Sequence, residues 1–466
     1  MPDLPIRFNP ARIFEFRRRM LPEDLAWEEA AELPAASEEP MAKVALVGLA
    51  LIVFHFYAEI EMWLPGAGPP YSTEQHTGLA LFVSQLPIAH ALGLLSLIGI
   101  IFYTSTYAAR FYFTGYQTWL LAAFVFWVLL TVPFSAAGRE SLMYWFGTVL
   151  KLLGLFIVTI NAVRNIRSLR TLLWVIILCG CMPAVGTILS WIFPPTGHVQ
   201  RTGGRPGWLG NFWDPNCVAY FMAMLMSIGL YLFESSKKTG KIIVVCLFGL
   251  FGFTAMITLS RAGMMALAAV FGTHFLTSKR KWLSLLVGAV VLIAIIPKIP
   301  GVVSRAETII EYKQDLSAMS RLHLWRAGLT MAKEHPIFGV GVSAFHTISG
   351  WYVKQPRRVP WRGPHSSYMG VLAETGFIGL GLFLALHLVT IRDAWRLYRR
   401  TARMDDATCR QLSRISRALI IALAGVCTVH LTLDRAYEYQ LYIFIALVVC
   451  VKQIAARAGV RVDAVT

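Results

Sequence analysis

An arginine stands where two long apolar runs meet, in the sequence Ser260-Arg261-Ala262-Gly263. Almost no loop separates the two runs, so the charge lies close to the apolar layer that they form. An arginine at such a depth is costly and by default marks a functional site. Arg261 is therefore a candidate for binding an anion, and the alternative is a helix-end side chain that reaches the lipid headgroups.

A second basic site is predicted in the glycine-rich loop 194–214, which carries Arg201 and Arg205. The loop ends in Asp214-Pro215-Asn216, which suits a helix start because aspartate can cap the helix and proline fits its first turn. A helix N-terminus beside two arginines is a reasonable anion site. An ordinary glycine-rich turn fits the same spacing.

A histidine that could move a proton stands at the entry of a later apolar run, in Gly-Pro-His365-Ser-Ser-Tyr. Near neutral pH, His365 could deprotonate an acceptor hydroxyl, although a lone histidine is more often structural. Glu374 follows about two and a half helical turns deeper. It could act as a second base, pair with an arginine, or cap a helix that is interrupted at Thr375-Gly376.

Motifs for metal or nucleotide chemistry are missing from the sequence. It has no Walker loop, no HExxH, no GxSxG and no carboxylate cluster suited to Mg²⁺, which argues against an ATP-driven pump and a metal-dependent transferase. We therefore predict no cofactor and no metal. The seven cysteines form no CxxC pair and are interpreted as packing residues. The acidic and basic residues Asp434, Arg435 and Glu438 are interpreted as a local ion pair.

The elements that must position these residues are membrane helices. The chain has 466 residues, of which 56% are hydrophobic and 15% charged, and its mean hydropathy is +0.58. Apolar runs long enough to cross a bilayer recur along the whole length. The fold class is predicted to be all-α, a polytopic membrane protein with about twelve spans. The predicted spans are 44–63, 78–104, 117–134, 142–162, 171–193, 215–233, 242–259, 262–277, 283–297, 366–390, 418–432 and 439–455.

The net charge of +17 gives an orientation. With the N-terminus inside, the cytoplasmic connections collect arginines and lysines, among them segment 392–417 with eight arginines. Both termini are then cytoplasmic, and the protein is assigned to the bacterial inner membrane. Nucleic acid is excluded as a partner because the basic residues lie in short loops between helices and not on one soluble face. The long outward loop 298–365 is also basic, which suggests an anionic ligand on that side.

Five regions follow from these predictions. They are a cytoplasmic extension at 1–42, nine transmembrane helices at 43–297 with the outer loop 194–214, a large periplasmic loop at 298–365, three further helices at 366–455, and a cytoplasmic tail at 456–466.

Three segments resemble the O-antigen ligase and polymerase superfamily. They read SRLHLWRAGL from residue 320, HPIFGVGVSAF from residue 335 and HSSYMGVLAETGFIGL from residue 365. Arg261 is similar to the arginine that follows a mid-chain span in that family, and Arg205 with Asp214-Pro215-Asn216 is similar to its R…G…PN loop. The resemblance covers residues from about 200 to 385, and the remainder fits by topology.

The resemblance implies a metal-independent glycosyltransferase of the multi-spanning GT-C type, with a helical periplasmic loop. The donor would be a glycan on undecaprenyl pyrophosphate, and the acceptor a glycolipid or polysaccharide within reach of membrane lipids. Catalysis is predicted at His365 and Glu374. The donor pyrophosphate is predicted to be bound by Arg205, Arg261, Arg201 and Arg321, and the matching arginine of the glycine-rich loop is either Arg201 or Arg205.

Three hypotheses stay open. The first is a ligase that moves a finished glycan onto an acceptor such as lipid A-core or a protein hydroxyl, the latter being the reaction of a protein O-oligosaccharyltransferase. The second is a polymerase that extends a repeat-unit polymer on the same carrier. The third is a transporter of a lipid-linked anion, which would need deep charges in several spans and an internal repeat.

Overall fold

The structure is a computed structural model that describes residues 40–58, 88–106, 111–113, 115–193, 205–208, 212, 214–278, 281, 316–353, 363–404 and 406–460. Several predicted features fall outside these residues. They are most of the 1–42 extension, most of the loop 194–214 with Arg201, the span at 283–297, parts of the loop 298–365 and most of the tail 456–466.

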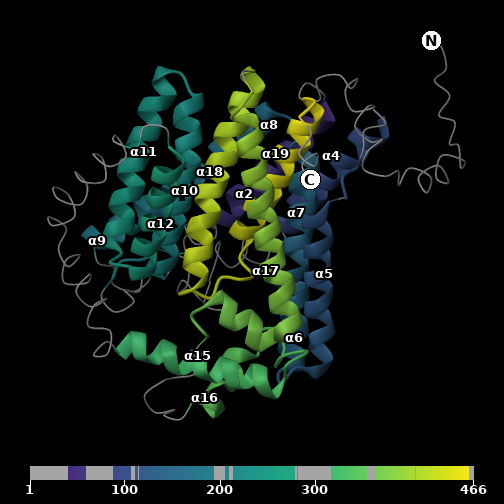
Figure 1. The fold of residues 1–466 in the computed structure, drawn as a ribbon, viewed down its shortest axis with the longest axis vertical. Coiled ribbons are helices and arrows are strands. Elements are labelled where there is room, and N and C mark those ends of the chain that lie inside the picture. The colour runs from purple at the N-terminus through teal and green to yellow at the C-terminus, as the bar shows by residue number, and fades with distance from the viewer. Residues whose placement is uncertain are drawn as a thin grey trace, which may run out of the picture.

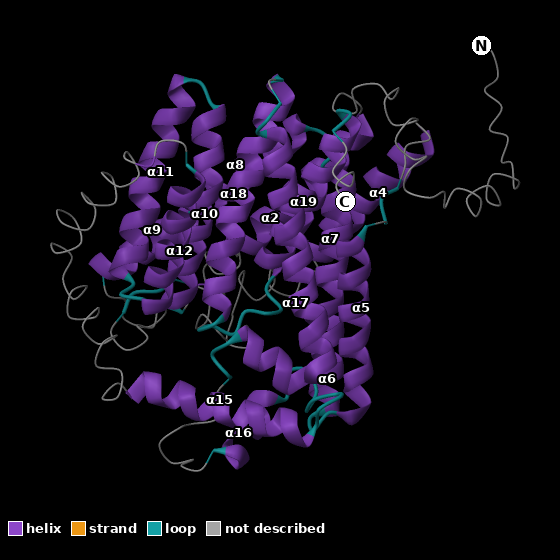
Figure 2. Cartoon of the chain, viewed as in Figure 1, coloured by secondary structure: helices purple, strands orange, loops and turns teal. Residues whose placement is uncertain are grey.

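The described part of the chain is helical, with no strand, and short loops join the helices (Figure 2). Among the described residues, eight helical segments are long and apolar enough to cross a membrane, and two shorter apolar helices lie toward the start of the chain. The prediction of an all-α polytopic membrane protein is therefore confirmed. The helices are α2 (Pro40–Ala58), α4 (Ile88–Thr106), α5 (Tyr116–Thr131), α6 (Gly138–Tyr144), α7 (Leu150–Ala162), α8 (Ile166–Cys179), α9 (Cys181–Ile192), α10 (Pro215–Ser235), α11 (Lys238–Ile257), α12 (Arg261–Thr277), α15 (Leu316–Glu334), α16 (Phe345–Tyr352), α17 (Ser367–Thr401), α18 (Ala407–His430) and α19 (Tyr439–Arg457).

Described helices occupy eleven of the twelve predicted spans, and their bounds differ where charged residues continue a helix. α17 runs to Thr401 and α18 begins at Ala407, so most of the arginine-rich segment 392–417 is helical. Hydropathy marks only the apolar part of a helix, and therefore missed these polar ends. A short 3-10 turn, Val132–Phe134, extends α5, and a π-helical turn, Trp145–Val149, joins α6 to α7.

The centre of the bundle is formed by α10, α18 and α19, whose apolar windows are mostly buried. α10 packs against α11, α12 and α18. The approach of α12 to α10 is close at Gly263, where an added Cβ would collide with the side chain of Ala219. Small residues at such contacts let membrane helices come together. This packing holds the N-termini of α10 and α12 near each other.

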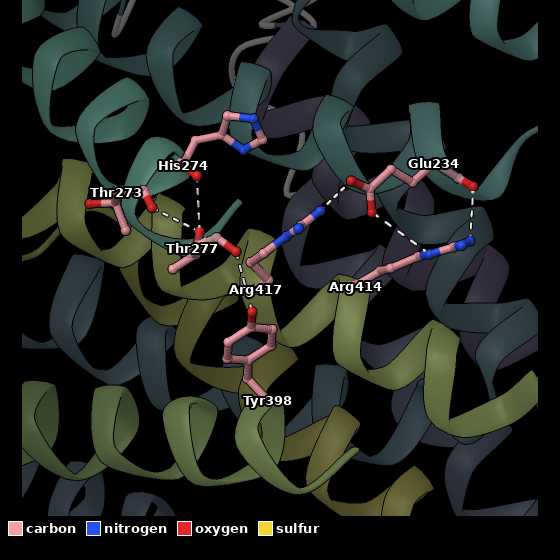
Figure 3. Close-up of polar contacts among 7 residues, drawn as sticks. All are labelled: Glu234, Thr273, His274, Thr277, Tyr398, Arg414 and Arg417. Atoms are coloured by element: carbon pink, nitrogen blue, oxygen red, sulfur yellow. Dashed lines mark hydrogen bonds and ion pairs between the residues drawn. The ribbon is translucent and has the colours of Figure 1, made fainter. Parts of the chain in front are cut away.

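Two ends of the bundle differ in character (Figure 1). α15 and α16 lie together at one end, which we call the α15 side. The opposite end, which we call the basic side, carries arginines and lysines that form ion pairs with acidic residues of neighbouring helices. There Arg414 and Arg417 reach Glu234, as Figure 3 shows, and Lys452 donates to Asp393 at 2.6 Å.

Candidate active site

α17 is interrupted at Gly376, which has φ 70° and ψ −173° inside an otherwise helical stretch. Only glycine adopts this conformation readily. A Cβ at this position would also collide with the carbonyl oxygen of Ile337. The interruption predicted at Thr375-Gly376 is therefore present, and it leaves the last carbonyls of the first half-helix without helical partners.

Loop 335–344 supplies the missing partners. It carries two further glycines with positive φ, Gly339 (66°) and Gly341 (95°). Phe377, just after the interruption, donates its amide back to Pro336 O at 2.9 Å. Three of the carbonyls left without helical partners accept hydrogen bonds from outside α17. Val340 N donates to Ala373 O (2.9 Å), Gly341 N donates to Glu374 O (3.0 Å), and Trp127 Nε1 donates to Thr375 O (2.9 Å).

The carboxylate of Glu374 faces the start of α16. The side chain is 7% exposed, and its Oε1 accepts the backbone N–H of Phe345 at 3.4 Å. A carboxylate at a helix N-terminus satisfies an amide that has no partner inside the helix, and is favoured by the positive end of the helix. Glu374 therefore joins α17 to α16, and its remaining oxygen surface lines a cavity.

The cavity has a volume of about 190 Å³ and lies between α6, α16, α17 and the loop that joins α18 to α19. Its lining is mostly polar and combines acids with one arginine, one imidazole and two phenols. The lining residues are Tyr144, Ser343, His346, Glu374, Asp434, Arg435, Ala436, Tyr437 and Glu438.

Asp434 lies in the loop that joins α18 to α19, outside the membrane helices, and lines the cavity. The protein groups around it remove part of its hydration, which disfavours the charged form of a carboxyl group. This desolvation, opposed by Arg435 and reinforced by Glu438, raises the pKa of Asp434 to about 6. A carboxyl group with this pKa can exchange a proton near neutral pH.

His365 lies in a tight turn at the start of α17, with φ 51°, a left-handed conformation that is uncommon for residues other than glycine. Trp325 of α15 donates to Pro364 O at 3.0 Å, just before this turn. Ser366 caps α17 and donates to His430 O at 3.1 Å. The neighbouring Ser367 donates to Leu433 O at 2.9 Å, so three contacts fix the backbone around a half-buried imidazole.

The carboxylate of Asp434 lies directly beside this turn. An added Cβ would come within 3.3 Å of it at Gly363 and within 3.0 Å at Gly370. Gly363 precedes His365 in the sequence and Gly370 follows it. Because neither glycine has a side chain, both leave room for the carboxylate of Asp434. The cavity and the histidine turn are adjacent, although His365 itself is not among the lining residues.

The N-termini of α10 and α12 meet at Asn216. Its Oδ1 accepts from Ser260 Oγ at 2.8 Å and from Arg205 Nη1 at 3.4 Å. Asp214 caps α10, as the sequence predicted, and Ser260 caps α12. Arg261 is the first residue of α12 and is half-buried. Two helix N-termini with two arginines beside them form an arrangement suited to an anion.

Arg435 connects this pair of helix ends to the cavity. Its guanidinium contacts Cys217 in the first turn of α10 and pairs with Glu438. Its backbone N–H donates to Ser367 Oγ at 2.8 Å, beside the histidine turn. A continuous set of contacts therefore runs from Asn216 to the start of α17.

The structure brings most of the predicted site residues to the α15 side. The segments that carry Arg205, Arg261 and His365 are linked by the contacts above, and Glu374 lines the cavity next to them. Arg321 lies on α15, one helical turn before the tryptophan that binds Pro364 O. Arg201 lies outside the described residues.

Asp434 and His346 are cavity residues that the sequence did not identify as candidates. The charges around Asp434 were interpreted as a local ion pair, and the pair Arg435–Glu438 is indeed present. The signal that could have found Asp434 is a third charge in a short loop between two apolar spans. No cluster of three or more His, Cys, Asp or Glu side chains suited to a metal ion occurs in the part of the chain that the structure describes.

A family model described as O-antigen ligase matches residues 244–384, which confirms the resemblance inferred from the sequence motifs. The matched region begins within α11 and ends within α17. It contains Arg261, Arg321, His365 and Glu374, and it excludes Arg205 and Asp434. No curated protein matches the chain.

Proposed function

We propose that this membrane protein transfers a glycan from an undecaprenyl-pyrophosphate carrier to an acceptor hydroxyl, and that it is an O-antigen ligase acting on lipid A-core. One observation carries the proposal: arginines at two helix N-termini and a histidine turn beside an acid-lined cavity converge on the α15 side. The O-antigen ligase match over residues 244–384 supports this class of reaction.

The leaving group of the reaction is a pyrophosphate, on which negative charge develops as the glycosidic bond breaks. Fixed positive groups lower the energy of that charge more than water does. Arg205 and Arg261 would bind it together with the N-termini of α10 and α12, and Arg321 would approach from α15. Guanidinium groups suit this role because they bind phosphate oxygens in a bidentate manner.

The acceptor hydroxyl would lose its proton to His365. Its oxygen attacks the anomeric carbon of the donor, the bond from that carbon to the pyrophosphate oxygen breaks, and the electron pair leaves with the carrier. Glu374 would hold the start of α16 in place beside the base, because its carboxylate accepts the backbone N–H of Phe345. His346 is the competing imidazole, since it lines the cavity.

We further propose that the α15 side faces the periplasm and that both termini lie in the cytoplasm. The basic side then carries the arginines and lysines that the positive-inside rule places in cytoplasmic loops. The metal-independent mechanism predicts that transfer persists in chelator.

A repeat-unit polymerase is the second candidate, because the same donor residues serve both reactions. Deleting the gene in its host and examining the surface glycans separates the two. Uncapped lipid A-core with intact polymer on the carrier supports a ligase, and single-repeat products support a polymerase. Unchanged glycans would exclude both.

A further inference from the structure

A groove of about 520 Å³ lies on the basic side of the α10–α11 hairpin, far from the candidate active site along both helices. Of its eight lining residues, three are lysines, one is a serine and four are apolar, and we call these four the apolar half. The lining residues are Phe233, Ser236, Lys237, Lys238, Lys241, Ile242, Val245 and Cys246.

The positive charge of the groove is not neutralised by the protein. Its three lysines are exposed, and they form no ion pair within the part of the chain that the structure describes. The acid of this hairpin, Glu234, is held by Arg414 and Arg417 of α18 (Figure 3). Glu234 is therefore not available to the lysines, and the groove offers three cationic groups to a ligand.

The apolar half of the groove faces outward. Ile242 is 57% exposed and Val245 is 55% exposed, and only 33% of the apolar window of α11 is buried. α11 lies at the edge of the bundle in Figure 1, next to α10 and α12. In a bilayer these side chains would contact acyl chains, while the lysines at the helix end would lie at headgroup level.

We propose that this groove binds an anionic phospholipid, with the headgroup phosphate at Lys237, Lys238 and Lys241 and one acyl chain along Ile242 and Val245. A free phosphate would use the lysines but leave the apolar half uncovered. A zwitterionic lipid would fill the apolar half without net charge to match three lysines. The inference stands independently of the proposed transfer reaction, because it uses no residue of the α15 side.

The test uses purified full-length protein and native mass spectrometry to measure retention of phosphatidylglycerol and of phosphatidylcholine with the same acyl chains. Each juxtamembrane lysine contributes about a fivefold gain in affinity for an anionic lipid. We expect Lys237→Gln/Lys238→Gln/Lys241→Gln to weaken phosphatidylglycerol binding about 100-fold and to leave phosphatidylcholine unaffected. A control with three exposed arginines at and just beyond the end of α17 replaced, Arg396→Gln/Arg399→Gln/Arg403→Gln, should keep the binding. An equal loss in both triple variants, or none in the lysine variant, would overturn the proposal.

A second variant tests the apolar half without changing charge. Val245→Trp places a bulky ring in the groove, and because Val245 is exposed the fold should tolerate the change. It should weaken phosphatidylglycerol binding at least tenfold, whereas general attraction to a basic surface predicts no change. Glycerol 3-phosphate should fail to compete at equal concentration, and effective competition would mean that the groove takes a free phosphate. Size-exclusion profiles check that each variant is folded.

Discussion

Gly376 is the residue on which the shape of the candidate active site depends most directly. Its φ of 70° with ψ of −173° lies in a region that other residues almost never occupy. Replacing it with alanine adds about 1–3 kcal/mol of backbone strain, before any collision is counted. The added Cβ would also meet the carbonyl of Ile337, so loop 335–344 must move away from α17.

The matched control is Gly381→Ala in the second half of α17. Gly381 is exposed and has no atom within 4 Å of an added Cβ, so alanine there should be neutral or stabilise the helix by up to about 1 kcal/mol. The two variants should therefore differ by about 1–4 kcal/mol in free energy of unfolding. The pair isolates the backbone interruption from the general effect of alanine in this helix.

Two assays compare the purified variants. The first is thermal unfolding, and the second is the rate of glycan transfer in liposomes, measured per amount of folded protein. Displacement of the loop moves Glu374 relative to α16, and misplacement of about 1 Å can reduce a rate about 100-fold. We expect Gly376→Ala to unfold at a lower temperature than the wild type and to transfer glycan at least about 100-fold more slowly. If it matched Gly381→Ala in both stability and transfer, the interruption would not be what positions the site.

Three further predictions test single residues. His365→Ala should insert and fold but lose transfer, whereas His346→Ala should keep most of it, and the reverse result in a transfer assay would assign the base to His346. The pKa of Asp434, about 6, lies above its ordinary value, so the folded protein binds a proton that the unfolded chain releases. Its unfolding temperature should therefore decrease as the pH rises from about 4 to 6, and Asp434→Asn should flatten this dependence, whereas an unchanged slope would contradict the raised pKa. The topology is tested by cysteine labelling in a variant that lacks the exposed Cys246. An impermeant maleimide added to intact cells should label Trp351→Cys on α16 but not Thr239→Cys on the basic side. The opposite pattern would invert the proposed topology.

The sequence predicted the features that depend on local chemistry. Apolar length located the membrane helices, Asp214-Pro215 marked the start of α10, and Thr375-Gly376 marked the interruption of α17. Each of these follows from a few neighbouring residues, because caps, turns and spans are specified by local residue types.

The features that the sequence did not predict depend on contacts between distant segments. Nothing near Asp434 in the sequence shows that two glycines around His365 would make room for its carboxylate. Likewise, the bond between Arg435 N and Ser367 Oγ joins residues 68 positions apart. The composition of the cavity follows from the packing of four elements and could not be derived from any one of them.

The most direct test of the account is transfer by the purified protein in liposomes that contain an undecaprenyl-pyrophosphate-linked glycan and lipid A-core. The wild-type chain should join the glycan to the core and release the carrier pyrophosphate, with chelator present throughout. Arg261→Gln should reduce this by about 100-fold or more, as expected when a group that stabilises developing charge is removed. Transfer that is unaffected by the loss of Arg261, or a wild-type protein that releases no carrier with any hydroxyl acceptor, would contradict the proposed site.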